Sequence, residues 1–254
     1  MPRRYPRPAC SVISKLAARV WVGRRTSNLI AMVQLDYEVI DLSEEELARE
    51  REVYGGLAQS VRELSLASLR TTVDEDEAIA IRAEIEAITE RLMASVRERE
   101  HLGIRVRKDG LVLSDGNAVI GTRNPVAPPL QIETTDRGAR SEFRLNALYE
   151  GPPGCVHGGV IALVMDQICG EAAISQGHPG MTGTLTIRYA RPTRLGECSA
   201  EAWVEEVDGV KTIVRGVLRD AKGRETATAE GVFIMPRWAR EAMTETAITP
   251  PRFD

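Results

Sequence analysis

One carboxylate, Asp166, lies within a segment whose other side chains are almost all apolar. The segment 160–174 would be apolar on nearly every side of a helix, which is typical of a buried helix. A carboxylate in such a place must be hydrogen-bonded or paired with a cation. Just before it, His157, Gly158 and Gly159 put flexible backbone at the predicted helix start, where unpaired N–H groups favour negative charge. The pattern predicts a reaction centre that combines an acid with an anion-binding helix start.

The elements around this acid predict an α+β fold. A strand is predicted at 141–149 and a helix over 158–175, and four further strands follow at 182–190, 198–207, 211–220 and 226–235. Asp208-Gly209 and Lys222-Gly223 are typical of hairpin turns, so these strands should pair antiparallel. One apolar helix against an antiparallel sheet of five or more strands forms a layered fold. We expect the curved sheet to wrap the helix on all sides.

The N-terminal half predicts a helical hairpin. Ser43 and Glu46 form a capping-box pattern at the start of a helix over 43–70, weakened in its middle by two glycines, and a second helix follows over 74–100. We expect the hairpin to pack on the body or on a partner subunit; its acidic helices do not favour DNA binding. Short strands are predicted at 104–107, 111–114 and 118–121. A proline-rich stretch then predicts a boundary, which gives a leader at 1–35, the helical extension at 36–125, the main domain at 126–240 and a tail at 241–254.

Charge and cysteine usage limit the classes of partner. Residues 1–35 carry seven basic residues and no acid, and the whole chain has a net charge of −4, which leaves about −11 for the remainder. This negative charge argues against nucleic acid as the main partner. We expect no membrane span, and the four widely spaced cysteines predict neither a metal site nor a disulfide framework. The basic leader fits an organellar transit peptide, a disordered tail, or an over-long gene start with Met32 as the true first residue. We expect a cytoplasmic protein, or an organellar one if the leader is a transit peptide.

Two stretches resemble a known enzyme family. GPPGCVHGGVIALVMD at 151–166 and MTGTLTIRYARPTRLGE at 181–197 resemble the hotdog-fold acyl-CoA thioesterases of the PaaI and thioesterase-superfamily-member type, and the likeness covers about 130–236. The resemblance implies a hotdog fold, an acyl-CoA substrate and a role in lipid metabolism. It implies no cofactor and no metal, and a homodimer or homotetramer with active sites shared between subunits.

The resemblance also assigns roles to individual residues. Gly158 would donate its backbone N–H to the thioester carbonyl, Asp166 would act as general base or as a nucleophile forming an anhydride, and Thr182 would hold the attacking water. The further candidates are His157 for catalysis and Gly159, Arg188 and Arg191 for substrate binding. Arg188, Arg191 and Arg194 could contact the phosphates of coenzyme A.

Purely structural roles are the alternatives for most of these residues. His157 could only cap the helix, Asp166 could be a structural acid paired with an arginine, Thr182 could only favour the strand, and the arginines could be surface charge. Cys155 and Cys169 are expected to be small buried side chains, and His178 a turn residue.

The spacing of Gly158 and Asp166 along the helix, and one departure from the family pattern at Gly151, complete the prediction. Gly158 and Asp166 are eight residues apart on one helix, about 12 Å at 1.5 Å per residue, so one carbonyl cannot contact both. If both are catalytic, a two-fold dimer must bring one subunit's Asp166 to the other's Gly158. Several relatives carry Asn or Gln six residues before the histidine, where this chain has Gly151. A non-catalytic acyl-CoA-binding hotdog module is therefore the alternative, and a hotdog dehydratase a weaker one.

Overall fold

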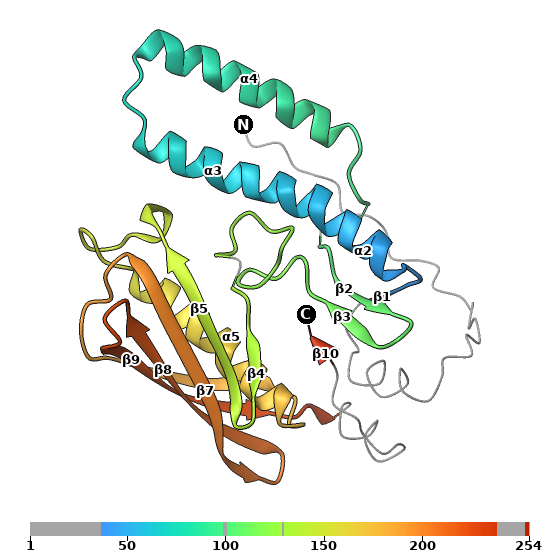
Figure 1. Cartoon of the computed structure of the whole chain (residues 1–254), viewed down its shortest axis with the longest axis vertical. Coiled ribbons are helices and arrows are strands. Elements are labelled where there is room, and N and C mark those ends of the chain that lie inside the picture. The colour runs from blue at the N-terminus through green and yellow to red at the C-terminus, as the bar shows by residue number, and fades with distance from the viewer. Residues whose placement is uncertain (1–36, 99–100, 129, 238–251, 254) are drawn as a thin grey trace, which may run out of the picture.

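The computed structural model describes residues 37–98, 101–128, 130–237 and 252–253, which form two sheets and the helices attached to them (Figure 1). The larger sheet has six antiparallel strands in the order β4-β5-β7-β8-β9-β6, and the smaller has four in the order β1-β2-β3-β10. The predicted tail and leader lie outside the described residues, apart from the two residues of β10, Arg252–Phe253.

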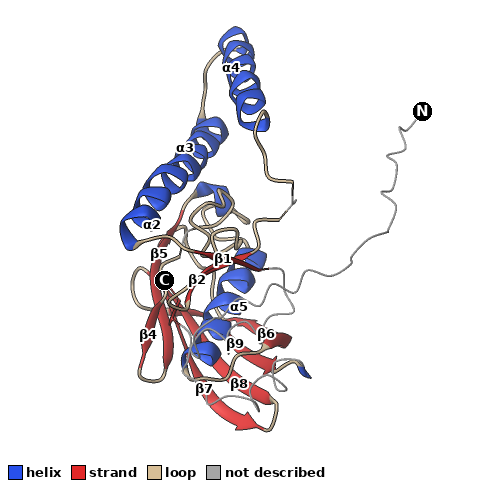
Figure 2. Ribbon diagram, turned by 90° about the vertical axis from the view of Figure 1, so that its right-hand side faces the viewer, coloured by secondary structure: helices blue, strands red, loops and turns tan. Residues whose placement is uncertain are grey.

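The larger sheet and one long helix form the predicted hotdog fold. A 3-10 turn, η2 (Ala147–Tyr149), leads from the sheet toward the helix. The helix α5 (Gly158–Ser175) crosses one face of the sheet (Figures 1 and 2) and begins and ends where the sequence predicted. The strands are β4 (Glu133–Thr135), β5 (Gly138–Leu145), β6 (Met181–Tyr189), β7 (Gly196–Asp208), β8 (Lys211–Asp220) and β9 (Glu225–Ile234). The predicted hairpins β7–β8 and β8–β9 are confirmed as antiparallel pairs.

The core lies between α5 and this sheet. Seven side chains of α5 are buried: Ile161, Val164, Met165, Ile168, Cys169, Ala172 and Ala173. The helix lies so close to β8 that a Cβ added at Gly216 would lie 2.6 Å from the Met165 methyl carbon. Such close packing is typical of protein interiors, where even one added methyl group disturbs the packing. The hotdog core therefore fixes the position of α5 against the sheet.

The sheet does not wrap α5 on all sides, and that expectation is wrong. Gly159 and Leu163 are exposed and Asp166 and Gly170 are half-buried, and this spacing of three and four residues marks one face of the helix. The apolar composition of α5 led us to expect burial of every face, but the sheet covers only one side. Asp166 therefore lies on the open face of α5 and not inside the core.

We expected no membrane-length apolar stretch, but α5 has the length and apolarity of one. It is the one such helix among the described residues, with a mean hydropathy of 1.3 over 18 residues. Packing against the sheet accounts for the apolar character of its covered side, although 39% of the helix is buried in the single chain.

The N-terminal half forms the smaller sheet and a helical arm. Strand β1 (Tyr37–Ile40) precedes α2 (Glu44–Glu50), a π-helical turn η1 (Arg51–Gly55), α3 (Gly56–Arg70) and α4 (Glu75–Met93). The capping box of Ser43 and Glu46 is confirmed. The helix widens into the π turn at the predicted weak point, and the second helix ends at Met93 instead of about residue 100.

The helical arm is attached to the body through α2 and α3. Arg62 of α3 donates hydrogen bonds to the carbonyls of Ala127, Thr122 and Asn124. In contrast, α4 stands clear of the larger sheet in both views (Figures 1 and 2) and contains no buried residue. The predicted packing of the hairpin on the body therefore holds for α3 and not for α4.

Two predicted strands of the following segment are present and one is not. Strands β2 (Ile104–Arg107) and β3 (Leu111–Leu113) form a hairpin, but 118–121 is a turn. The Asn117 side chain accepts the N–H groups of Val119 and Ile120, which competes with strand pairing. The same side chain donates to Gln167 of α5 at 3.0 Å. The turn therefore ties the smaller sheet to the central helix.

A buried arginine holds the N-terminal half together. Only 5% of the Arg105 side chain is exposed; it pairs with Glu50 at 2.7 Å and with Asp115. Burial lowers the pKa of Arg105, but the Asp115 and Glu50 carboxylates outweigh that effect and raise it above its usual value. We expect Arg105→Ala to lower the free energy of unfolding by about 3–5 kcal/mol, because two carboxylates lose their buried partner. Denaturant unfolding of the full chain measures this.

Arg82→Ala is the control for this prediction. Arg82 forms an exposed ion pair with Glu86 at 2.9 Å on α4, where its loss should cost less than about 1 kcal/mol. Equal costs for the two variants would contradict the role given to Arg105.

Candidate active site

The start of α5 presents one unpaired backbone donor. His157 is the N-cap residue, and its Nδ1 accepts the N–H of Gly159 at 3.0 Å. Val160 and Ile161 donate their N–H groups to the His157 carbonyl. No acceptor for the Gly158 N–H occurs in the described part of the chain. This donor lies at the positive end of the helix dipole, where it can bind a carbonyl oxygen that gains negative charge.

The loop before α5 is held by its own hydrogen bonds. The N–H of His157 donates to the Tyr149 carbonyl at 2.9 Å, and the N–H of Gly154 donates to the Glu150 carboxylate at 2.5 Å. Gly154 has a φ of +70°, which favours glycine. The N–H of Val156 donates to the Thr193 carbonyl, so the loop is attached to the segment before β7. The helix start therefore has a fixed position although two glycines form it.

Asp166 is paired with Thr182. The Thr182 hydroxyl donates to Asp166 Oδ1 at 2.9 Å. The expected burial of Asp166 is not observed, since it is half-buried, and among the ion pairs of the described residues none includes it. Pairing with an arginine, the structural alternative, therefore finds no support. One carboxylate oxygen accepts the hydrogen bond from the Thr182 hydroxyl, and the other can accept a proton from water.

A β-bulge directs Thr182 toward the helix. Thr182 pairs with Phe233 and Thr184 with Val232, so Gly183 is an extra residue in β6. Residues 185 and 187 pack against the core, so simple alternation would place residue 182 on the outer face of the sheet. The extra residue reverses this, and Thr182 shares the inner face with the buried Phe233. A glycine within a strand was the one local sign of the bulge in the sequence.

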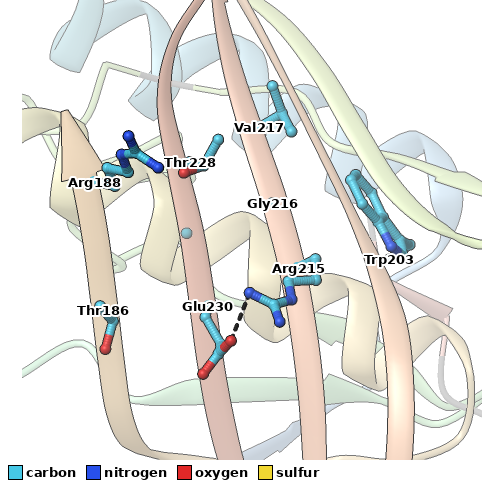
Figure 3. Close-up of a pocket in the computed structure, with 9 residues that line it drawn as sticks. Thr186, Arg188, Trp203, Arg215, Gly216, Val217, Thr228 and Glu230 are labelled. Carbon is cyan, nitrogen blue, oxygen red and sulfur yellow. Dashed lines mark ion pairs between the residues drawn. The ribbon is translucent and has the colours of Figure 1, made fainter. Parts of the chain in front are cut away.

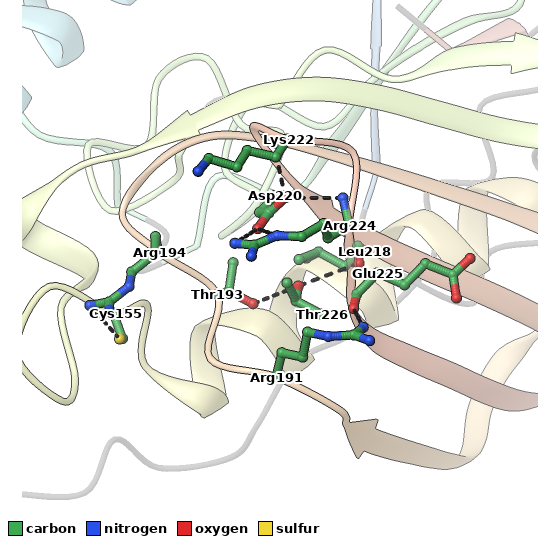
Figure 4. A network of polar contacts seen from close by, with 10 residues as sticks. All are labelled: Cys155, Arg191, Thr193, Arg194, Leu218, Asp220, Lys222, Arg224, Glu225 and Thr226. Atoms are coloured by element: carbon green, nitrogen blue, oxygen red, sulfur yellow. Dashed lines mark hydrogen bonds and ion pairs between the residues drawn. The ribbon is translucent and has the colours of Figure 1, made fainter.

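The three arginines lie in different places. Arg188 alternates with the core-facing Ile187 and lies on the outer face of the sheet, where it lines a hollow of about 400 Å³ with Trp203 and Arg215 (Figure 3). Within one chain it is therefore on the opposite face from Asp166. Arg191 donates to the Glu225 carbonyl at 2.6 Å (Figure 4).

Arg194 is the arginine that the chain brings to the helix start. Its Nη1 lies 3.6 Å from Cys155 Sγ, two residues before His157 (Figure 4). Nearby, Asp220 accepts from Arg224 and closes the β8–β9 turn, and this hydrogen bond lowers the pKa of Asp220. Arg224 is thus occupied by the turn, and Arg194 is the better placed of the basic residues for a ligand at α5.

The cysteines are small buried side chains, as expected. Cys155, Cys169 and Cys198 are free and buried. Burial and the nearby Asp166 charge raise the pKa of Cys169 to about 12, and burial raises the pKa of Cys198 to about 11. Both are therefore neutral thiols near pH 7, which does not suit a nucleophile.

Gly151 leaves no room for the side chain that several relatives carry at this position. A Cβ added there would lie 2.8 Å from the His157 Cα. An Asn or Gln would have to displace the residue that caps α5. The path of the loop backbone therefore leaves no space for an amide side chain at residue 151.

Tyr189 was not among the site residues predicted from the sequence, but it contacts the helix start. Its hydroxyl donates to the Gly158 carbonyl at 2.9 Å, and its ring atoms would lie 3.6 Å from a Cβ at Gly158. The alternation of β6 could have identified it, because residues 185, 187 and 189 share one face of the strand. Both ends of β6 therefore carry a hydroxyl bonded to α5, from Thr182 and from Tyr189.

Comparisons with known proteins show the family of this fold. The family description "Thioesterase superfamily" matches residues 153–227, which include Asp166 and both β6 hydroxyls. The solved structure of protein RHA08564, a thioesterase superfamily protein, is 31% identical, covers 71% of this chain and 90% of its own, and superposes with a TM-score of 0.63.

Two curated relatives are acyl-coenzyme A thioesterases named THEM4. The Xenopus laevis protein is 33% identical over 99 residues, which is 37% of this chain and 44% of the relative. The Mus musculus protein is 38% identical over 75 residues, which is 29% of this chain and 32% of the relative. The chain thus spans less than half the length of these curated relatives.

Proposed function

Because the chain belongs to the thioesterase superfamily, we propose that it is an acyl-CoA thioesterase, which hydrolyses an acyl-CoA thioester to a free carboxylic acid and coenzyme A. The curated relatives are acyl-CoA thioesterases, which supports this substrate class. The observation that carries the proposal is the open face of α5. It presents an unpaired N–H at Gly158 and a carboxylate at Asp166 that Thr182 holds in place.

In the proposed reaction Asp166 activates water. Its free oxygen takes one water proton while the water oxygen bonds to the thioester carbonyl carbon, and the C–S bond then breaks. The departing thiolate of coenzyme A takes up that proton, so the protons balance. A carboxylate positioned in this way typically contributes 10²–10⁴-fold to the rate. The same oxygen could instead attack the carbonyl and form an anhydride, which water would then hydrolyse.

Gly158 would stabilise the charge that develops on the carbonyl oxygen. A thioester carbonyl is already electrophilic, so one backbone N–H with the helix dipole is useful polarisation. Thiolates leave readily, so no acid is needed at the sulfur and the residues present suffice. His157 serves as the cap that orients the helix start, and Arg194 is the proposed contact for a phosphate of coenzyme A.

The proposed active site requires two subunits. Gly158 and Asp166 are about 12 Å apart along α5, further than one carbonyl can bridge. Both lie near the open face of the helix, which also exposes 39% of Leu163. A two-fold dimer that places two α5 helices antiparallel on these faces would join Asp166 of one subunit to Gly158 of the other, giving two equivalent sites.

A thiol-release assay across short, medium, long and aryl acyl-CoAs tests the function. We expect the purified full chain to release coenzyme A from at least one of these classes. Absence of release from all of them, with acyl-CoA bound at micromolar strength, would instead support a non-catalytic binding module. The missing amide at Gly151 is the observation that favours that alternative.

A further inference from the structure

We propose that Tyr189 is a positioning residue that fixes the direction of the Gly158 N–H through the peptide group between Gly158 and Gly159. This inference rests on the proposed function, because it gives Tyr189 a task only if Gly158 binds the thioester carbonyl. The evidence is a pair of hydrogen bonds to one peptide group, one at each of its ends.

The peptide group between the two glycines is held from both sides. Its carbonyl, on Gly158, accepts the Tyr189 hydroxyl at 2.9 Å. Its N–H, on Gly159, donates to His157 Nδ1 at 3.0 Å. The loop fixes where α5 begins, and Val160 and Ile161 hold the His157 carbonyl, but consecutive glycines have the widest range of backbone angles. The two bonds narrow the orientations that remain open to the peptide group between them.

The position of the ring explains why a tyrosine suits this task. Tyr189 lies on the core-facing side of β6, which is fixed by its pairing with β9 over eight residue pairs. The Cε1, Cζ and hydroxyl oxygen atoms of Tyr189 would lie 3.6 Å from a Cβ added at Gly158, so the ring faces the helix start across the space of one carbon atom, and its hydroxyl donates to the Gly158 carbonyl. Half of the side chain, 51%, remains exposed in the single chain, so Tyr189 adds little to the core. Its position favours a role at the site over a role in stability.

The consequence for catalysis is orientation. A donor accelerates acyl transfer only if it points at the position that the oxyanion will take. The Gly158 N–H belongs to the peptide group just before the clamped one, and the carbonyl of that group, on His157, accepts from Val160 and Ile161. With the clamp, both peptide groups beside the Gly158 Cα are held, which fixes the backbone angles on which the direction of the N–H depends. Loss of the hydroxyl should therefore reduce kcat and leave KM nearly unchanged, since ground-state binding uses other contacts.

Tyr189→Phe is the test variant and Tyr149→Phe its matched control. Tyr149 also donates its hydroxyl to a backbone carbonyl, that of Val126 at 3.3 Å, and its own carbonyl accepts the His157 N–H, a backbone bond that the phenylalanine variant keeps. In Tyr189→Phe we expect kcat to fall about five- to tenfold, in line with the loss of one hydrogen bond, with KM within about twofold. Tyr149→Phe should match the wild type in both. A kcat for Tyr189→Phe equal to that of the control would overturn the inference.

Two further measurements separate this inference from the proposed function. Amide hydrogen exchange at Gly159 needs no substrate, and we expect it to be about fivefold faster in Tyr189→Phe than in Tyr149→Phe; equal rates would overturn the clamp even if the protein hydrolyses nothing. In an Asp166→Asn background, the infrared carbonyl stretch of a bound ¹³C-labelled acyl-CoA should move toward its value in water when Tyr189 becomes Phe. An unmoved band would mean that the hydroxyl has a structural role only. Failure of the wild type to release thiol would contradict the proposed function alone.

Discussion

Asp166→Asn is expected to lower kcat for acyl-CoA hydrolysis by 10²- to 10⁴-fold, the usual range for loss of a positioned general base. The amide has the size of the carboxylate, and its oxygen can still accept the Thr182 hydroxyl, so the local structure should be kept. The amide cannot take a proton from water and cannot attack the thioester. The same loss is therefore expected whether Asp166 is base or nucleophile. Initial rates of thiol release and a thermal unfolding curve measure the two effects separately.

Glu171→Gln is the matched control on the same helix. Burial raises the pKa of Glu171, and its carboxylate accepts from the Gln167 side chain at 2.7 Å. It has no contact with Thr182 or with the helix start among the described residues. We expect this variant to keep wild-type activity. An Asp166→Asn variant within twofold of the wild type would contradict the proposed reaction.

Gly158→Pro is expected to lower kcat by about 10²- to 10³-fold, because it removes the backbone N–H that is proposed to bind the oxyanion. Proline is well tolerated at the first position of a helix, where its missing N–H is not needed for the helix. The residue before a proline must be extended, and His157 already has φ −63° and ψ 135°. The change should thus remove a donor with little cost to the fold.

Gly158→Ala is the control for that variant. It adds a methyl group and keeps the N–H, and the atoms nearest to its Cβ would be those of Tyr189, at an ordinary 3.6 Å. We expect Gly158→Ala to retain most of the activity. If the alanine and proline variants were equally slow, bulk at Gly158 would be responsible and the N–H would have no special role.

The hotdog domain could be predicted well because its elements are long and regular. The bounds of α5 and β8 match the prediction, and β6, β7 and β9 match to within two residues. The short strands β1, β4 and β10 were missed. Strands β1 and β10 pair with segments far away in the chain, whereas β4 forms a local hairpin with β5 but has only three residues, too few for a clear alternating pattern. Strand β1, for example, pairs in parallel with β2, which begins 67 residues later.

The exposed face of α5 could not be predicted from the sequence. An apolar helix looks the same whether a sheet or a second chain covers a given face. Composition therefore indicated burial for Asp166, and the structure places it on the side that the sheet leaves open.

The candidate site could be predicted in part. Gly158, Asp166 and Thr182 were expected to act together, and Thr182 and Asp166 are hydrogen-bonded. The bulge at Gly183 that makes this contact possible depends on the register of β6 with β9, which no local pattern specifies. Tyr189 was missed for a related reason, because it lies 31 residues from its partner Gly158 in the chain.

The shared active site is tested most directly by a hybrid of two inactive variants. Asp166→Asn and Gly158→Pro chains with different affinity tags would be co-expressed, and dimers carrying both tags isolated. Each hybrid has one site with both defects and one with neither, so we predict about half of the wild-type activity per dimer. Activity no higher than that of the parent variants would contradict the account, because it would mean that each chain builds its site alone.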